Sequence, residues 1–181
     1  MKPSLKVWAP GILALGMAGG LWAQGKHDPS EKNQIHLQKE VRHELVTLPF
    51  YNVFDNFEYK IDGNTVTLMG QVTRPNLKSD AEKAVKGIEG VEQVVNNIEV
   101  LPLSPMDDQI RRAVYRAIYS DPGMDRYSIQ AVPSIHIIVR NGHVFLEGAA
   151  GTEMDKNLAY LRANGVPGVF SVTNNLHVDR T

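Results

Sequence analysis

One stretch occurs twice in the chain, as D-G-N-T-V-T-L-M-G from Asp62 to Gly70 and as R-N-G-H-V-F-L-E-G from Arg140 to Gly148. A second pair follows, G-V-E-Q-V-V-N-N-I-E-V from Gly90 to Val100 and G-V-F-S-V-T-N-N-L-H-V from Gly168 to Val178. The matching glycine and asparagine positions in both pairs are 78 residues apart. Several matches at one offset indicate two copies of one small module, so the function is sought in what that module can do.

The residues around the repeated stretches predict the elements of the module. In the first copy, apolar residues at helical spacing follow His36, and alternating residues on either side of Gly63-Asn64 predict a β-hairpin. A second helix is expected to begin near Pro75, because proline is well tolerated in the first turn. A last strand with alternating apolar residues closes the module at Val100.

The second copy predicts the same order of elements, with Asn141-Gly142 as the hairpin turn and a clearly longer loop from Asp121 to Pro133. The sequence therefore predicts an α+β protein of two tandem αββαβ modules, residues 36–103 and 106–180. Each module is expected to hold a small three-stranded mixed sheet covered on one face by two helices. The repeated asparagine of the last strand is expected to make structural hydrogen bonds in the sheet.

The N-terminus resembles an export signal. Residues 1–23 combine two early lysines, an apolar run and small residues before Gln24, which is typical of a cleaved signal peptide. An uncleaved anchor is the alternative, and both place the rest of the chain outside the cytoplasm. Residues 24–35 are polar, with a glycine and a proline, and are predicted to be a flexible tether.

Composition excludes several function classes. The chain has no cysteine, which excludes disulfides, thiolate metal sites and a lipid-modified cysteine. Its net charge of −1 argues against a nucleic-acid partner. Residues 36–103 carry 7 basic and 10 acidic side chains, whereas residues 106–180 carry 8 of each. This difference between related modules indicates that they have different roles.

No catalytic or metal-binding pattern is present in the sequence. Nucleophile-elbow, Walker and dinucleotide motifs are absent, and no set of nucleophile, base and orienting group can be assembled. The six histidines are scattered, and the acids near Asp107, Asp121 and Asp125 match no calcium loop. The sequence predicts no enzyme, no cofactor and no metal.

With the two helices and the glycine-valine stretches D-G-x-x-V-x-L-x-G and G-V-x-x-V-x-N-x-I-x-V, the chain resembles the BON domain family. It is similar to exported bacterial proteins with two BON domains in tandem, of the osmotically inducible periplasmic kind. The resemblance covers about residues 36–180. It implies an αββαβ fold, a periplasmic location, association with phospholipid, and a role in envelope integrity under osmotic or other stress. It implies no catalytic residues.

The first helix of the second module, Gln109 to Tyr119, is the candidate binding site. Its core-facing residues leave arginines and tyrosines on the other side, at spacings of three and four. Arginine binds phosphate through two parallel hydrogen bonds, and tyrosine favours the boundary between lipid and water. The residues predicted to bind lipid or a partner are Arg111, Arg112, Tyr115, Arg116 and Tyr119.

The leading hypothesis is a non-enzymatic envelope protein that contacts an anionic phospholipid surface peripherally and supports the envelope under stress. Other envelope proteins are further candidate partners. The alternative is a soluble periplasmic module that binds proteins or acts like a chaperone, for which Tyr115, Tyr119 and Phe145 are the exposed apolar candidates. A third alternative, a hydrolase, lacks any catalytic set.

Overall fold

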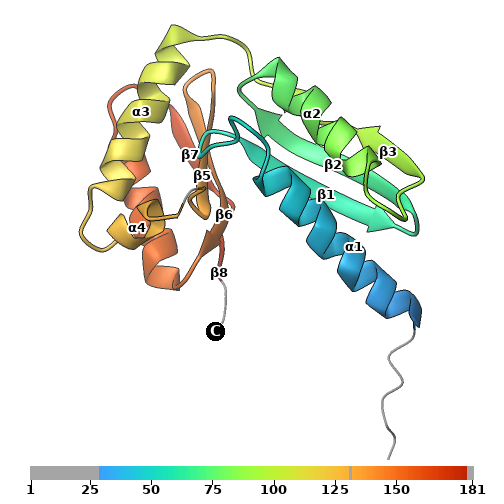
Figure 1. Ribbon diagram of the computed structural model, residues 1–181. Coiled ribbons are helices and arrows are strands. Elements are labelled where there is room, and N and C mark those ends of the chain that lie inside the picture. The colour runs from blue at the N-terminus through green and yellow to red at the C-terminus, as the bar shows by residue number, and fades with distance from the viewer. Residues whose placement is uncertain (1–28, 131, 179–181) are drawn as a thin grey trace, which may run out of the picture.

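The computed structural model describes residues 29–130 and 132–178, and it confirms the α+β fold with two tandem modules (Figure 1). The predicted signal peptide lies outside the described residues. The first module consists of α1 (Pro29–Val46), β1 (Asn56–Asp62), β2 (Thr65–Val72), α2 (Pro75–Lys86), β3 (Gln93–Asn96) and β4 (Glu99–Val100). The second consists of α3 (Pro105–Tyr119), the short 3-10 helix η1 (Asp125–Ser128), β5 (Ile135–Arg140), β6 (His143–Ala150), α4 (Glu153–Asn164), β7 (Ser171–Asn174) and β8 (His177–Val178).

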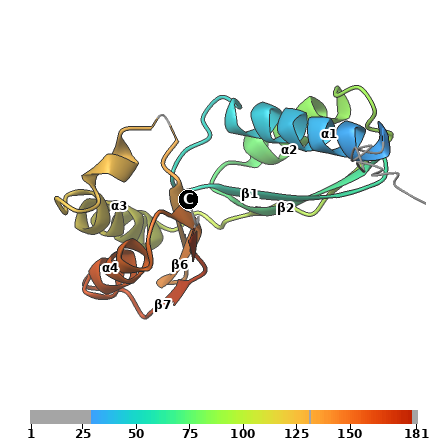
Figure 2. The ribbon, with the colours of Figure 1, turned by 90° about the horizontal axis from the view of Figure 1, so that it is seen from below.

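Each module has a mixed sheet of three strands, the last of which is interrupted. β1 pairs with β2 antiparallel, and both β3 and β4 pair with β2 in parallel. The second module repeats this pairing through β5, β6, β7 and β8. In both modules the two helices lie on the same face of the sheet (Figure 2). In each module the helices and the sheet enclose a hydrophobic core of their own. The core of the first module is built around Val41, Leu68 and Val85, and that of the second around Val114, Leu146 and Ala159.

The interruption of the last strand is made by the repeated asparagine. Asn96 donates from its amide to the carbonyl of Lys78 on α2 at 2.9 Å, and its oxygen accepts from the backbone of Ile98 at 3.2 Å. Asn174 makes the same pair of bonds in the second module, to Lys156 at 2.9 Å and Leu176 at 3.3 Å. The predicted structural role is confirmed, and the asparagine ties the last strand to the second helix.

Helix α1 begins earlier than the sequence predicted. Residues 29–35 were expected to belong to the flexible tether, but the helix starts at Pro29. Proline is favourable at the first helical position because the amide it lacks has no partner there anyway. Asn33, Gln34 and Ile35 are exposed, so this first part of the helix shows no apolar periodicity in the sequence.

The modules are joined by a segment of the first that packs into the second. Val53, in the loop between α1 and β1, is 7% exposed and belongs to the hydrophobic core of the second module. Its carbonyl accepts from the backbone of Ile137 in β5 at 2.8 Å, and Phe54 meets Tyr115 edge to face. Asp55 anchors the segment by accepting from the backbone and hydroxyl of Thr73 at 2.6 and 2.8 Å.

His136, on β5, is a buried histidine of this junction. The ring of Tyr51 stacks on it with centroids 5.6 Å apart, and the tyrosine hydroxyl lies 3.4 Å from Nε2. Nδ1 is buried and makes no hydrogen bond. Burial lowers the pKa of His136 below its ordinary value, and the nearby carbonyls of Asp55 and Asn52 oppose the shift only in part. The neutral imidazole is therefore the form that the folded protein favours.

We expect this histidine to make the protein less stable as the pH falls below about 6.5, the ordinary histidine pKa. The unfolded chain takes up a proton there while the folded chain resists it, so protons favour unfolding. Glu147 is the cross-strand neighbour of His136, Tyr51 stacks on its ring, and Arg42 and His177 line the same cavity. Urea unfolding of the native protein and of His136→Gln at pH 7.5 and pH 5.5 measures the effect. The loss of stability between these values should be smaller in the variant, and an equal loss would contradict the prediction.

Candidate functional site

Local sequence positions helix α3 over the sheet of the second module. Ser104 caps the helix by accepting from the backbone of Asp107 at 3.2 Å, and Pro105 occupies its first turn. The side chains of Ile110, Val114 and Ile118 are buried against the sheet, as their spacing predicts. Of the remaining side chains of the helix, some are polar and buried, and others lie on a face that borders the first module.

Two of the five predicted binding residues are buried and do not belong to an exposed face. Arg111 is 4% exposed, and its guanidinium donates to the carbonyl of Val139 at 2.7 Å and pairs with Asp108. Tyr119 is 6% exposed, and its hydroxyl donates to the carbonyl of Ile135 at 2.6 Å. Burial raises the pKa of Tyr119, which keeps this donor protonated. The surface of α3 that packs on β5 is wider than the row of apolar side chains on the helix. Arg111 and Tyr119 therefore lie within this packed surface and stabilise the fold.

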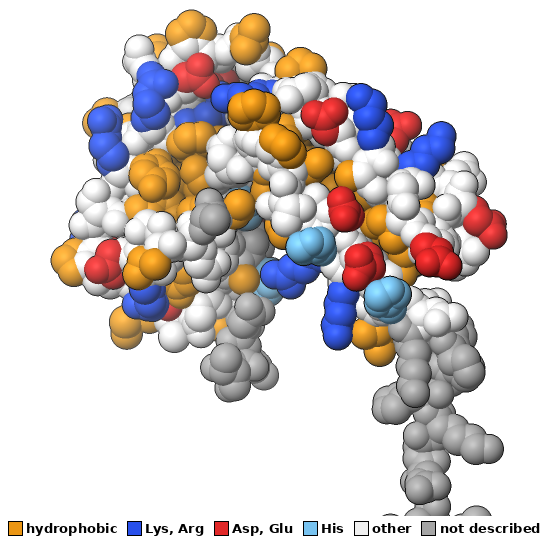
Figure 3. Space-filling model, in the orientation of Figure 1, with side chains coloured by type: hydrophobic (Ala, Val, Ile, Leu, Met, Phe, Trp, Pro, Cys, Tyr) orange, Lys and Arg blue, Asp and Glu red, His pale blue; other side chains and the backbone are white. Residues whose placement is uncertain are grey.

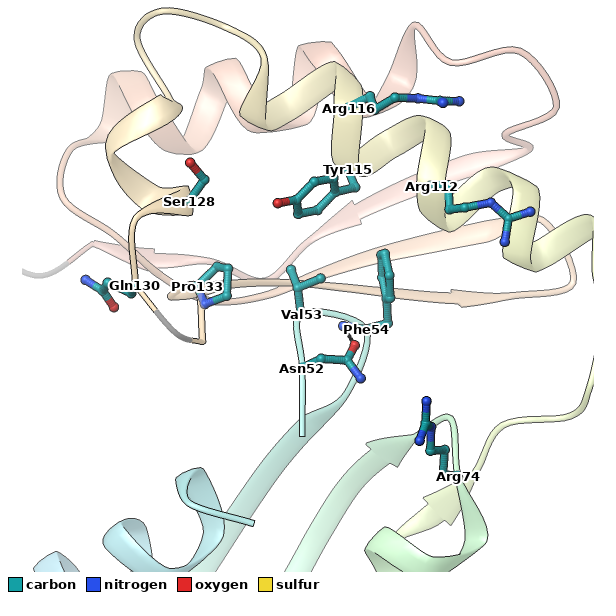
Figure 4. A pocket seen from close by; sticks show the side chains of 10 residues that line it. All are labelled: Asn52, Val53, Phe54, Arg74, Arg112, Tyr115, Arg116, Ser128, Gln130 and Pro133. Atoms are coloured by element: carbon teal, nitrogen blue, oxygen red, sulfur yellow. Dashed lines mark hydrogen bonds between the residues drawn. The ribbon is translucent and has the colours of Figure 1, made fainter. Parts of the chain in front are cut away.

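The other three predicted residues, Arg112, Tyr115 and Arg116, line one pocket of about 680 Å³. Arg112 and Arg116 are exposed and Tyr115 is half-buried. The first module supplies the opposite wall through the loop of Phe54 and through Arg74 (Figure 4). In this view Arg74 points up from the first module toward α3, with Phe54 and Asn52 between them. We call this cavity the arginine pocket.

The charges of Arg112 and Arg116 are not neutralised within the described part of the chain. Neither Arg112 nor Arg116 has a hydrogen bond or a carboxylate in contact there, whereas Arg126, Arg140 and Arg162 each pair with an acid. Arg74 lies over the ring of Phe50, with its guanidinium carbon 4.9 Å from the ring centroid, and it interacts electrostatically with Asp55 without forming an ion pair in contact. Three guanidinium groups without a strong ion pair thus line one cavity, and they favour an anion with several oxygens.

The long loop of the second module completes the wall of the pocket. Ser128, Gln130 and Pro133 line it from this loop. Tyr127 holds the loop in place, because its hydroxyl donates to Asp155 at 2.8 Å and accepts from the backbone of Gly151 at 2.7 Å. Burial alone would raise the pKa of Asp155, but the donors Arg126, Tyr127 and Thr152 lower it, so the carboxylate stays charged.

Arg74 and Phe54 are among the groups of this site that the sequence did not indicate. Both belong to the first module, and only the arrangement of the two modules brings them beside α3. No periodicity or motif marks either residue. Phe145, an exposed apolar candidate in the sequence, is half-buried.

The groups that line the arginine pocket are suited to binding an anion. The arginine pocket offers guanidinium, phenol and amide groups but no carboxylate or imidazole as a base. In the described ranges, no three histidine or acidic side chains come together as a metal site would require. Among the helices of the same residues, none is long and apolar enough to cross a membrane.

Comparison with known proteins gives a family match and distant likenesses to solved structures, two of which are described below. The family model of the BON domain matches residues 55–102 and 106–180. The C-terminal domain of CdsD, the structural protein of the type III secretion system of Chlamydia trachomatis, is 14% identical, with a TM-score of 0.32 over 81% of this chain and 99% of that chain. A second CdsD structure is 13% identical, with a TM-score of 0.29 over 81% and 93%. These TM-scores are too low to support an argument about function. No curated protein matches the chain.

Proposed function

The chain belongs to the BON domain family, and on that premise we propose that it is a non-enzymatic protein of the bacterial cell envelope that binds anionic phospholipid headgroups. The observation that carries the proposal is the arginine pocket, which Arg74, Arg112 and Arg116 line together and no carboxylate lines. A phosphate group can accept hydrogen bonds from more than one guanidinium, which suits this arrangement. In this role the protein acts in the periplasm and supports the envelope under osmotic or other stress.

Exposed apolar side chains beside the pocket suit a membrane surface. Phe50 is in contact with Arg74, and Leu103 lines the adjoining cavity together with Arg112. Ile129 lies in the sequence between Ser128 and Gln130, which both line the pocket. All three are strongly exposed. Side chains of this kind enter the interfacial region of a bilayer when nearby basic groups meet the headgroups. The basic groups then supply the attraction and the apolar groups the anchoring.

Reversing the charge of two arginines tests the proposal. We expect Arg112→Glu with Arg116→Glu to lower binding of residues 24–181 to anionic vesicles by about 30-fold or more, because each basic residue near such a surface contributes about 1 kcal/mol. Arg74→Glu should also weaken binding, which tests the part of the pocket that the first module supplies. Co-sedimentation with neutral and with anionic vesicles, at low and moderate salt, measures both effects.

The matched control is Lys83→Glu with Lys86→Glu in the last turn of α2, which changes the net charge equally at exposed positions away from the pocket. This control should bind vesicles nearly as well as the native protein. Equal losses in both double variants would mean that overall charge, not the pocket, governs binding. Failure of the native protein to bind vesicles at any salt would favour the alternative, a soluble module that binds other proteins.

A further inference from the structure

A second groove at the module junction is lined by different chemistry. It has a volume of about 660 Å³ and lies between the end of α1 and the start of β1 on one side, and β5, β6 and β8 on the other. A hollow between the two modules, with basic and histidine side chains along it, is visible in the space-filling view (Figure 3). The residues that matter for its chemistry are Arg42, Val46, Tyr51, Phe57, His136 and Ala149. We call it the junction groove.

One wall of the junction groove is aromatic. Tyr51 stacks on Phe57, with ring centroids 4.9 Å apart, and on His136 at 5.6 Å. Tyr59, a further lining residue, is held by a hydrogen bond from its hydroxyl to the carbonyl of Gln38 at 3.0 Å. The rings come from both modules and fix one another, so they offer a flat apolar surface that is formed before any ligand arrives.

Two small residues form part of the opposite wall, beside the lining residues Gln130, Val132, Pro133 and Ser134 that precede β5. Gly148 and Ala149 line the groove near the end of β6. Gly148 has φ +99°, and a Cβ atom there would lie 2.2 Å from the carbonyl oxygen of Ser134. A larger side chain therefore cannot occupy this position, and the space beside the aromatic wall stays open to a ligand.

The ionisable lining groups favour an anion. No carboxylate lines the junction groove, and its ionisable groups besides tyrosine are Arg42, His136 and His177. Arg42 is exposed and has no ion pair within residues 29–130 and 132–178. A guanidinium at the end of an apolar and aromatic surface matches a molecule with an apolar body and one anionic group.

The internal repeat relates the junction groove to the arginine pocket. Val41 and Leu45 of α1 correspond to Val114 and Ile118 of α3, because both pairs are buried on the same helical face, 73 residues apart. Arg42 therefore stands where the second module has Tyr115. Each first helix borders one junction cavity, but the arginine pocket has three arginines and the junction groove has one. The two cavities are thus suited to different anions.

We propose that the junction groove binds small apolar acids, molecules with an aromatic or aliphatic body and a single carboxylate or sulfonate. The body lies between the ring of Tyr51 and the small residues of β6, and the anionic group pairs with Arg42. Because both modules line the groove, the ligand contacts both. This site is independent of headgroup binding at the arginine pocket.

Two fluorescent probes of nearly the same shape test the proposal. The first, 1-anilinonaphthalene-8-sulfonate, carries an anionic group, and the second, N-phenyl-1-naphthylamine, does not. We expect residues 24–181 to bind the sulfonate with one dominant site. Arg42→Gln should weaken the sulfonate at least about tenfold, since it removes a hydrogen bond between charged groups, and should change the neutral probe by less than about twofold. Fluorescence titration measures both affinities.

Two further variants locate the site. Ala149→Trp fills the groove and should abolish binding of both probes, while Val46→Glu, at an exposed position of α1, should weaken only the sulfonate. Because loosely packed proteins also bind the sulfonate, each variant must keep the native unfolding midpoint to be counted. If Ala149→Trp does not fold, the sulfonate affinity of Val46→Glu still tests whether the probe binds in the junction groove.

The arginine pocket supplies the control. Arg112→Gln with Arg116→Gln should leave sulfonate affinity unchanged, and Arg42→Gln should leave vesicle binding unchanged. If Arg112→Gln with Arg116→Gln lost sulfonate binding while Arg42→Gln kept it, the probe would bind in the arginine pocket, and the proposal would be overturned. Absence of probe binding by the native protein would overturn it as well, whatever the vesicle experiment shows.

Discussion

Replacement of Gly70 by alanine is expected to destabilise the protein by about 3 kcal/mol or more. Gly70 has φ +106°, and a Cβ atom there would lie 2.1 Å from the carbonyl oxygen of Asn56 on the neighbouring strand. Both the backbone conformation and the approach of β1 to β2 exclude a side chain. The two strands are paired along their length, so the strain cannot be relieved without breaking the hairpin.

Gly90 provides the matched control. It has φ +92°, but nothing lies within 4 Å of the Cβ atom that alanine would add. Gly90→Ala should therefore show only the backbone cost, about 1–2 kcal/mol. Urea unfolding of both variants separates the two contributions. Equal destabilisation would mean that the contact with Asn56 relaxes at no cost, contrary to this expectation.

The second large effect is expected at Asp107, which is 1% exposed. Its carboxylate accepts from the backbone of Asn141 at 2.9 Å and of Gly142 at 2.8 Å, and so holds the turn between β5 and β6. Asp107→Ala leaves the buried amide of Gly142 without an acceptor and should cost about 3 kcal/mol. Asp107→Asn keeps one acceptor oxygen and should be intermediate.

Thermal or urea unfolding measures this loss, with Asp125→Ala as the control. Asp125 is also an aspartate of the second module, but it is exposed, and its change should stay within about 0.5 kcal/mol. Similar losses at both aspartates would contradict the role of Asp107 in holding the turn.

The sequence predicted the module well because the decisive residues act locally or within one module. The turn at Asn141-Gly142 has positive φ at both residues, as the dipeptide indicates. The asparagines at 96 and 174 make the structural bonds expected of a residue repeated without any catalytic neighbour. The start of α1 was missed because a polar, solvent-exposed helical turn carries no hydrophobic period.

The candidate site was predicted less completely, for two physical reasons. Helical spacing alone did not reveal that Arg111 and Tyr119 reach carbonyls of β5 from the margin of the apolar stripe. The terminal guanidinium nitrogens of Arg111 and the hydroxyl of Tyr119 find acceptors inside the protein, which hydropathy cannot indicate. Arg74 and Phe54 belong to the site only through the docking of the two modules, and contacts between distant segments leave no mark in the spacing of residues.

The place of Val53 has a consequence for how the chain folds. The repeat divides the sequence near the joint before α3, but the core of the second half includes this side chain from the first half. A fragment beginning at the joint would carry a vacancy in its interior and an uncovered strand edge at Ile137. The evolutionary unit and the cooperative folding unit therefore differ, and the second copy depends on residues that lie before the first hairpin.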